Sequence, residues 1–179
     1  MKKTIAVLLL IAAVFTWTAA AAQDIEIHRE GELFYIVVTL PSGTRVENSQ
    51  TDEHFSLTEI GYLTSGKPVI AITTAADELY VGLSLSDLPR EDIDRIISEI
   101  SVEMADPKTE VRVTPEGYEY IVVNEQTDAN DACDTVMLVN GYFIMVHVYY
   151  PDFSTLTPED EAIGPAIVET FRFVGNTNS

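Results

Sequence analysis

Apolar and polar residues alternate over much of this chain, with the period of a β-strand that buries one face. In the first half of the chain the alternation predicts four strands, at about residues 25–27, 34–38, 56–63 and 68–74. Glu30-Gly31 is expected to form a two-residue turn that pairs Ile27 with Phe34. The polar stretch 44–54 has no such alternation, so we expect a loop there.

The clearest local signal is Asn140-Gly141, which lies between two alternating apolar runs. Asn-Gly is favoured at the centre of a two-residue hairpin because both residues there need a positive φ. The turn fixes the register, so we expect Cys133 opposite Val148 on one face and Asp134 opposite His147 on the other. Both faces are apolar over much of their length, which predicts a central hairpin covered on both sides.

Two amphipathic segments predict the helices that would provide this cover. The first begins near Leu88-Pro89, and its isoleucines recur with helical spacing. These are Ile93, Ile96, Ile97 and Ile100. The second begins at Thr157-Pro158, with the acidic Asp160 three residues after the expected N-cap. Gly164-Pro165 lies inside this helix and is expected to kink its first turns.

With two further strands at 111–113 and 118–124, the predicted order is four strands, a helix, four strands and a helix. Runs of strands separated by single helices are typical of α+β domains. We therefore expect an antiparallel β-sheet covered by helices on both faces, an α/β/α sandwich.

Several segments in this order resemble one known fold. They are Phe34–Leu40 running into Pro41-Ser42-Gly43, Leu85-Ser86-Asp87, Pro115–Val123 and Leu156–Phe173. Together they resemble the fold shared by the PsbP-type extrinsic photosystem proteins and the Mog-type Ran-binding proteins. The resemblance implies an α/β/α sandwich around an antiparallel sheet, and a member that binds partners instead of catalysing a reaction. It assigns no functional residue, since no position here matches a family site.

The N-terminus has the three parts of a secretory signal peptide. Lys2-Lys3 precedes an apolar run, Ile5–Val14, and small residues follow up to Ala20-Ala21-Ala22. Cleavage after Ala22 would leave 23–179 as a single α+β domain. We expect that domain to be periplasmic or secreted, with no membrane span remaining.

The charge balance is strongly acidic. The chain has 10 Lys+Arg and 29 Asp+Glu, a net charge of −19 that becomes −21 when Lys2 and Lys3 leave with the signal. Such a surface repels nucleic-acid phosphates, so we expect no nucleic-acid partner, and the same repulsion argues against an anionic membrane surface. A protein or small ligand outside the cytoplasm remains, and the acidity also serves solubility.

Asp134 and His147 form the strongest candidate pair, because a carboxylate can orient an imidazole for acid/base chemistry. No serine or cysteine lies in a recognisable nucleophile motif, and Cys133 is expected to point to the opposite face. A cross-strand ionic pair is therefore the preferred interpretation. The alternative is a small secreted hydrolase or cation-dependent enzyme that uses this pair and the acidic loop 128–131.

That acidic loop does not match a calcium motif. Counting from Asp128, the fifth, sixth and twelfth positions of an EF-hand loop would be Ala132, Cys133 and Val139. Nor do the three histidines, His28, His54 and His147, show zinc-ligand spacing. We assign no catalytic, cofactor-binding or metal-binding residue from the sequence.

Two further features have both a structural and a functional interpretation. Cys133 is the single cysteine, and we expect it to be buried and unreactive. The aromatic cluster from Tyr149 to Phe153 is expected to pack under the loop before the last helix, with a binding surface as the alternative. Together these features predict an exported, non-enzymatic binding domain.

Overall fold

The computed structural model describes residues 21–28, 34–52, 55–101, 104, 106–125 and 132–175. Nearly all of the predicted signal peptide, the Glu30-Gly31 turn, His54 and loop residues 128–131 lie outside these ranges. These sequence-based expectations remain predictions.

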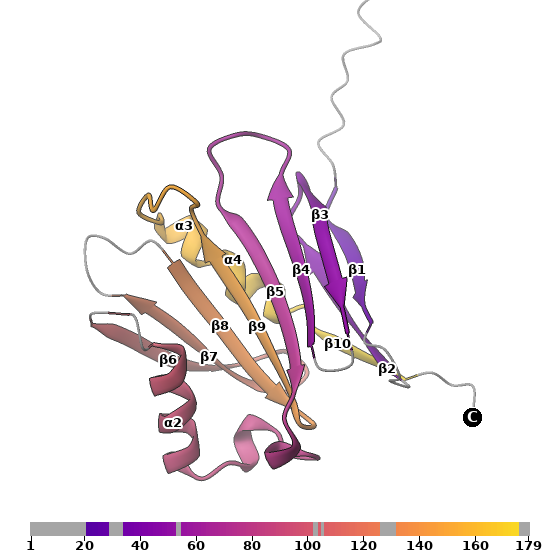
Figure 1. The fold of residues 1–179 in the computed structure, drawn as a ribbon, viewed down its shortest axis with the longest axis vertical. Helices are drawn as coiled ribbons and strands as arrows, with labels where there is room; N and C mark the ends of the chain where they lie inside the picture. The colour runs from indigo at the N-terminus through magenta and orange to yellow at the C-terminus, as the bar shows by residue number, and fades with distance from the viewer. Residues whose placement is uncertain are drawn as a thin grey trace, which may run out of the picture.

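The described chain forms two antiparallel sheets (Figure 1). The large sheet has the strand order β3-β4-β5-β9-β8-β7-β6. Its strands are β3 (Thr44–Thr51), β4 (Phe55–Tyr62), β5 (Val69–Ala76), β6 (Pro107–Val113), β7 (Glu119–Glu125), β8 (Ala132–Val139) and β9 (Tyr142–Tyr149). The small sheet, in the order β1-β2-β10, consists of β1 (Gln23–Ile27), β2 (Phe34–Leu40) and β10 (Arg172–Gly175). The helices are short: α2 (Arg90–Ile100), α3 (Pro158–Glu161) and α4 (Ile163–Val168), with 3₁₀ turns η1 (Glu78–Tyr80) and η2 (Leu85–Asp87).

The predicted α/β/α sandwich is wrong, because the layer expected to be helical is largely a second sheet. Apolar side chains of β1 and β2, such as Ile36 and Val38, share one core with Ile70 and Ile72 of β5. The short helices α3 and α4 pack beside the small sheet on this face. On the other face, α2 and the 3₁₀ turns pack mainly over β7 and β8, where Ile96 meets a second, smaller core. The fold is therefore mostly antiparallel β-sheet.

Two strands were missed, the first of them because it is polar. Residues 44–51, predicted as loop, form β3 at the edge of the large sheet, and all but Thr44 of its residues are exposed. An edge strand without a cover needs no apolar alternation, so a polar sequence can still pair with its neighbour. The other missed strand is β10, four residues that begin shortly after the end of α4 and pair with β2.

The central hairpin is confirmed. β8 and β9 lie in the middle of the large sheet, and Asn140 and Gly141 have φ values of 52° and 85°. Asp134 pairs with His147, and Cys133 with Val148, as the turn predicted. The β1–β2 register is different from the prediction, since Ile27 pairs with Ile36 instead of Phe34. The shift by two residues keeps the same faces of both strands buried.

Both helical segments begin where the sequence placed them. α2 starts at Arg90, directly after Pro89. Thr157 caps α3 and forms a capping box with Asp160, but the helix breaks at Ala162. The structure gives a reason for Gly164: a Cβ there would lie 2.6 Å from Thr135 Oγ1, so only glycine lets α4 approach β8 this closely.

A candidate binding groove on the open face of the large sheet

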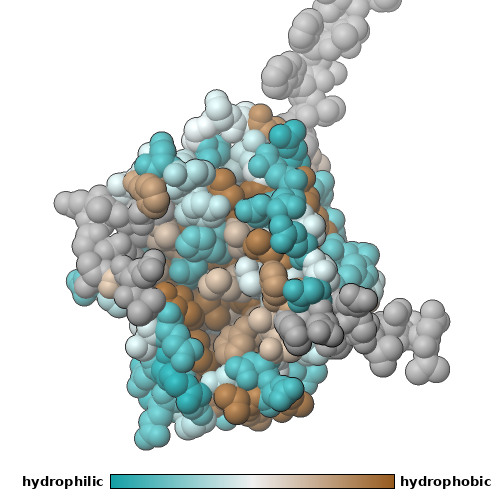
Figure 2. Space-filling view, viewed as in Figure 1, coloured by the Kyte–Doolittle hydropathy of each residue, from teal (hydrophilic) through white to brown (hydrophobic). Residues whose placement is uncertain are grey.

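The α2 face of the large sheet carries an open cavity, which we call the groove. Its volume is about 1010 Å³, within the range of small-molecule sites. It exists because α2 covers β7 and β8 but leaves β9 and β5 open beside it. In Figure 2 this face is hollowed next to α2, with hydrophobic residues at the bottom of the hollow and hydrophilic residues around it.

Alternate residues of the central strands form the floor. On β5 these are Ala71, Thr73 and Ala75, whose small side chains leave the space open. Met145 lies opposite Thr73 on β9 and supplies a larger apolar surface. Successive residues of a strand point to opposite faces, so the residues between them, such as Ile72, lie in the main core instead.

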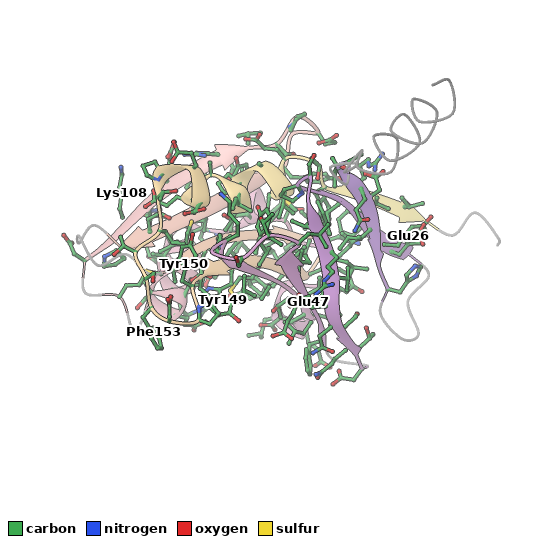
Figure 3. The ribbon with its side chains drawn as sticks, turned by 90° about the horizontal axis from the view of Figure 1, so that it is seen from above. Glu26, Glu47, Lys108, Tyr149, Tyr150 and Phe153 are labelled. Atoms are coloured by element: carbon green, nitrogen blue, oxygen red, sulfur yellow. The ribbon has the colours of Figure 1, made fainter. Side chains whose placement is uncertain are left out.

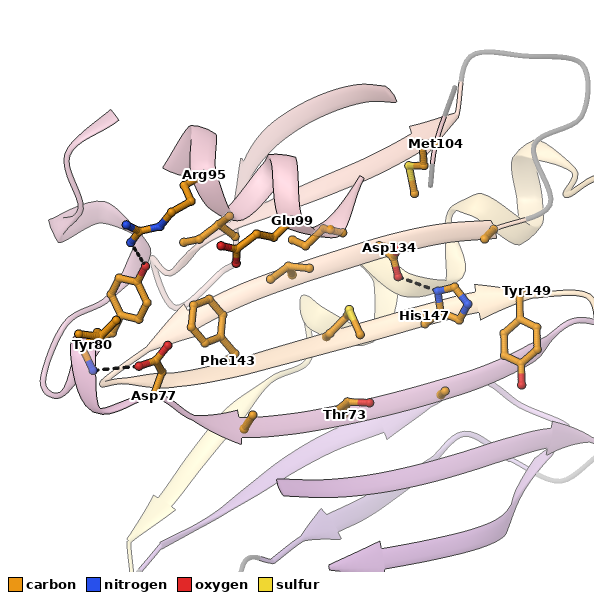
Figure 4. A pocket seen from close by; sticks show the side chains of 18 of the residues that line it. Thr73, Asp77, Tyr80, Arg95, Glu99, Met104, Asp134, Phe143, His147 and Tyr149 are labelled. Carbon is orange, nitrogen blue, oxygen red and sulfur yellow. Dashed lines mark hydrogen bonds and ion pairs between the residues drawn. The ribbon is translucent and has the colours of Figure 1, made fainter. Parts of the chain in front are cut away.

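One end of the groove combines aromatic rings with charged side chains (Figure 4). Tyr80 of η1 packs edge-on against Phe143 of β9, with their ring centroids 5.3 Å apart. Arg95 of α2 donates to the Tyr80 hydroxyl at 2.5 Å and forms an ion pair with Asp92 at 2.9 Å. Glu99, one turn further along α2, also lines this end, as does Asp77 before η1.

The other end contains the predicted pair of Asp134 and His147 (Figure 4). His147 Nδ1 lies 2.7 Å from Asp134 Oδ1, and the His147 ring is 4.9 Å from that of Tyr149. The Asp134 side chain is only 9% exposed, whereas that of His147 is 33% exposed and faces the groove. The cross-strand contact predicted from the hairpin register is thus confirmed.

Some residues of the aromatic cluster pack under the loop before the last helix, as expected, and others are exposed as in a binding surface. The Tyr150 hydroxyl donates to Asp160 Oδ2 at 3.3 Å, so this ring is tied to the start of α3. Phe153 is 79% exposed and lines the rim of the groove, with a positive φ of 58°. Figure 3 shows Phe153 at the periphery, away from α3 and α4. The expectation that the whole cluster packs under the loop is therefore wrong for Phe153.

Among the described residues that line the groove, Thr73 provides the only aliphatic hydroxyl, and none provides a thiol. Cys133 lies in the main core on the opposite face, as predicted. In the described parts of the chain, no group of three or more His, Cys, Asp or Glu side chains is placed to hold a metal ion. His28 is not among the residues that line the groove; it contacts Glu26 at 3.0 Å and stacks on Tyr35.

Cys133 is fully buried, and its Sγ lies 3.6 Å from the carbonyl oxygen of Glu161. Burial, with a smaller effect of the nearby Asp134 and Glu161 carboxylates, raises the pKa of the thiol from its ordinary value of 9.0 to about 12. Because the thiolate is the reactive form, this cysteine is inert in the folded protein.

We expect native protein at pH 8 to react with a thiol reagent orders of magnitude more slowly than protein unfolded in urea. The rate of this reaction is measured directly from the absorbance of the thiol that the reagent releases. Rapid labelling of the native chain would contradict the burial of Cys133.

The raised pKa also has a consequence for stability. Between pH 9 and 12 the unfolded chain loses the thiol proton that the native chain keeps, so the free energy of unfolding falls as pH rises. The slope from this group is at most about 1.4 kcal/mol per pH unit. Cys133→Ala lacks the contribution, so urea titrations of both proteins from pH 8 to 10 isolate it.

The helical side of the groove was not predicted from the sequence. No sequence pattern singled out Tyr80, Arg95 or Glu99, yet they line one end of the groove. The usable signal was the run of small residues on β5, Ala71, Thr73 and Ala75, on a strand whose other face is buried. Small side chains on a central strand leave room for something else to occupy that face.

No helix in the described part of the chain is both long and apolar enough to cross a membrane. A scan of protein-family models and a search of curated proteins found no match to this chain.

Proposed function

We propose that this chain is an exported, non-enzymatic binding domain that holds a ligand with an apolar body in the groove. The observation that carries the proposal is the groove itself, an open space of about 1010 Å³ over the centre of the large sheet. Its apolar floor is exposed to water in the unbound protein, and covering it with a ligand would be favourable.

The hydrogen bonding of the floor supports an apolar ligand body. β5 lies between β4 and β9, and β9 lies between β5 and β8, so the ladders already use their backbone amides and carbonyls. The side chains of Ala71, Ala75 and Met145 add no donors. A polar ligand body would lose its water without gaining partners, which is costly.

A groove-filling variant tests the proposal. Thr73→Trp places an indole over the floor, and we expect it to abolish the blue-shifted fluorescence that Nile red, a neutral apolar dye, shows with the wild type. Thr109→Trp makes the same change on the exposed edge strand β6, away from the groove, and should leave dye binding unchanged. Equal dye binding by all three proteins, or none by the wild type, would refute the proposal.

Export is part of the proposal and is supported by the N-terminal sequence. We expect mature protein recovered from outside the cytoplasm to begin at Gln23. N-terminal sequencing checks this, and an intact Met1 in the exported fraction would contradict it.

A second candidate function is hydrolysis, favoured by the 2.7 Å contact between Asp134 and His147 inside the groove. A carboxylate that orients an imidazole is two parts of a catalytic triad, and a water molecule would have to act as the nucleophile. Ester or amide turnover that disappears in His147→Ala, while Nile red binding persists, would favour this function over simple binding.

A further inference from the structure

We infer that the ligand of the groove is a cationic amphiphile, whose apolar chain lies on the floor and whose positive group lies at the Tyr80–Phe143 end beside Glu99. This inference rests on the proposed function. It adds the charge of the ligand and the end of the groove at which that charge binds.

The charges at this end favour a cation. Arg95 is the only arginine or lysine among the described lining residues, and it already pairs with Asp92 at 2.9 Å. Glu99 and Asp77 add two carboxylates to the lining of the same end, so carboxylates outnumber the single guanidinium there. The chain as a whole carries a net charge of −19, which attracts cations and repels anions.

The aromatic rings strengthen the same preference. Phe143 and Tyr80 meet edge to face at 5.3 Å, and both line the groove next to Glu99 in Figure 4. Aromatic faces attract ammonium groups, most strongly where water is partly excluded. Carboxylates beside aromatic rings therefore suit an alkylammonium group, which offers a charge on an apolar surface.

The shape of the site favours a small amphiphile over an extended peptide. A peptide strand needs backbone partners, but the floor strands β5 and β9 are paired on both sides. The groove also continues from Glu99 past Met145 to Tyr149. An apolar chain would therefore lie along the sheet, from the end that contains Glu99 to the end that contains Tyr149.

The test compares three compounds with the same tail: dodecyltrimethylammonium, dodecyl maltoside and dodecyl sulfate, each below its critical micelle concentration. Displacement of Nile red from the wild type gives their affinities. We expect the cationic compound to bind about fivefold more tightly than the neutral one, and the anionic compound to bind most weakly. Thr73→Trp should bind none of the three.

Glu99→Gln should reduce the preference for the cationic over the neutral compound to about twofold, with unchanged affinity for the neutral one. Glu91→Gln makes the same change in the first turn of α2, exposed and away from the groove, and should keep the full preference. An equal loss in both variants would assign the preference to the overall charge and overturn the inference.

Three other results would also overturn it. Tightest binding of dodecyl sulfate would assign the head group to Arg95 instead of Glu99. Displacement of the dye by a basic amphipathic peptide, but by none of the dodecyl compounds, would assign the groove to a protein partner. If all three compounds bind equally well, the proposed binding function stands and the cationic preference fails.

Discussion

Replacing Gly141 by alanine is expected to lower the free energy of unfolding by about 2–4 kcal/mol. Gly141 has a φ of 85°, a region that disfavours any side chain. A Cβ there would also lie 2.9 Å from the Cα of Val81 and 3.0 Å from the carbonyl oxygen of Tyr80. These are backbone atoms, which cannot rotate away as a side chain could, so the turn and the 80–81 segment must move apart.

A control separates the two causes. Gly66 has a similar φ of 74°, but a Cβ there would meet no atom within 4 Å. Gly66→Ala should therefore cost only the backbone strain, about 1 kcal/mol. Urea denaturation of both variants gives the comparison, and equal losses would show that the contact with residues 80 and 81 carries no energy.

The same substitution should affect the groove. The Gly141 amide donates to the Leu83 carbonyl at 2.8 Å, and its carbonyl accepts from the Asp77 amide at 3.2 Å. The hairpin turn thus holds the segment that supplies Asp77 and Tyr80 to the charged end of the groove. Movement of this segment should weaken ligand binding even under conditions in which Gly141→Ala remains folded.

Local sequence signals were sufficient for the centre of this fold. Asn140-Gly141 fixed a turn type, the turn fixed a register, and the register brought Asp134 to His147 and placed Cys133 on the other face. Each step depends on residues close in sequence and on the two-residue period of a strand. The capping box at Thr157 was predictable for the same reason.

The outer layers were not predictable in this way. β3 is polar because it lies at an exposed edge, so its sequence resembles a loop. The apolar faces of β8 and β9 indicated a cover on both sides, but apolar residues do not specify whether a helix or another sheet provides it. Here β1, β2 and β10 form most of one cover, and α2 provides only part of the other.

The groove was not predicted because it is the part of the sheet face that no helix covers. No periodicity in the sequence shows where a helix stops covering a sheet. Its floor combines positions from β5, β8 and β9, and its side comes from α2. Only the tertiary arrangement brings Glu99 near Phe143. The Asp134–His147 pair was found from the sequence, but its location at one end of a large groove was not.

Replacing Phe171 by alanine should be the most destabilising single truncation in the main core, with a loss of about 3–5 kcal/mol. Phe171 is fully buried between α4 and β10. Its ring meets Phe173 at 4.8 Å and Tyr118 at 6.2 Å, both edge to face. It therefore joins the last strand of the small sheet to the β6–β7 end of the large sheet, and its removal leaves a cavity where the two layers meet.

Phe153→Ala is the matched control, because it removes the same atoms from a side chain that is 79% exposed and should change stability by less than about 0.5 kcal/mol. Urea denaturation followed by circular dichroism measures both variants. If Phe171 joins the sheets as described, its variant should lose stability with an unchanged denaturant slope, because both sheets still unfold together. A clearly lower slope would indicate that the small sheet separates first, and a loss below 1 kcal/mol would show that the two sheets do not depend on this ring.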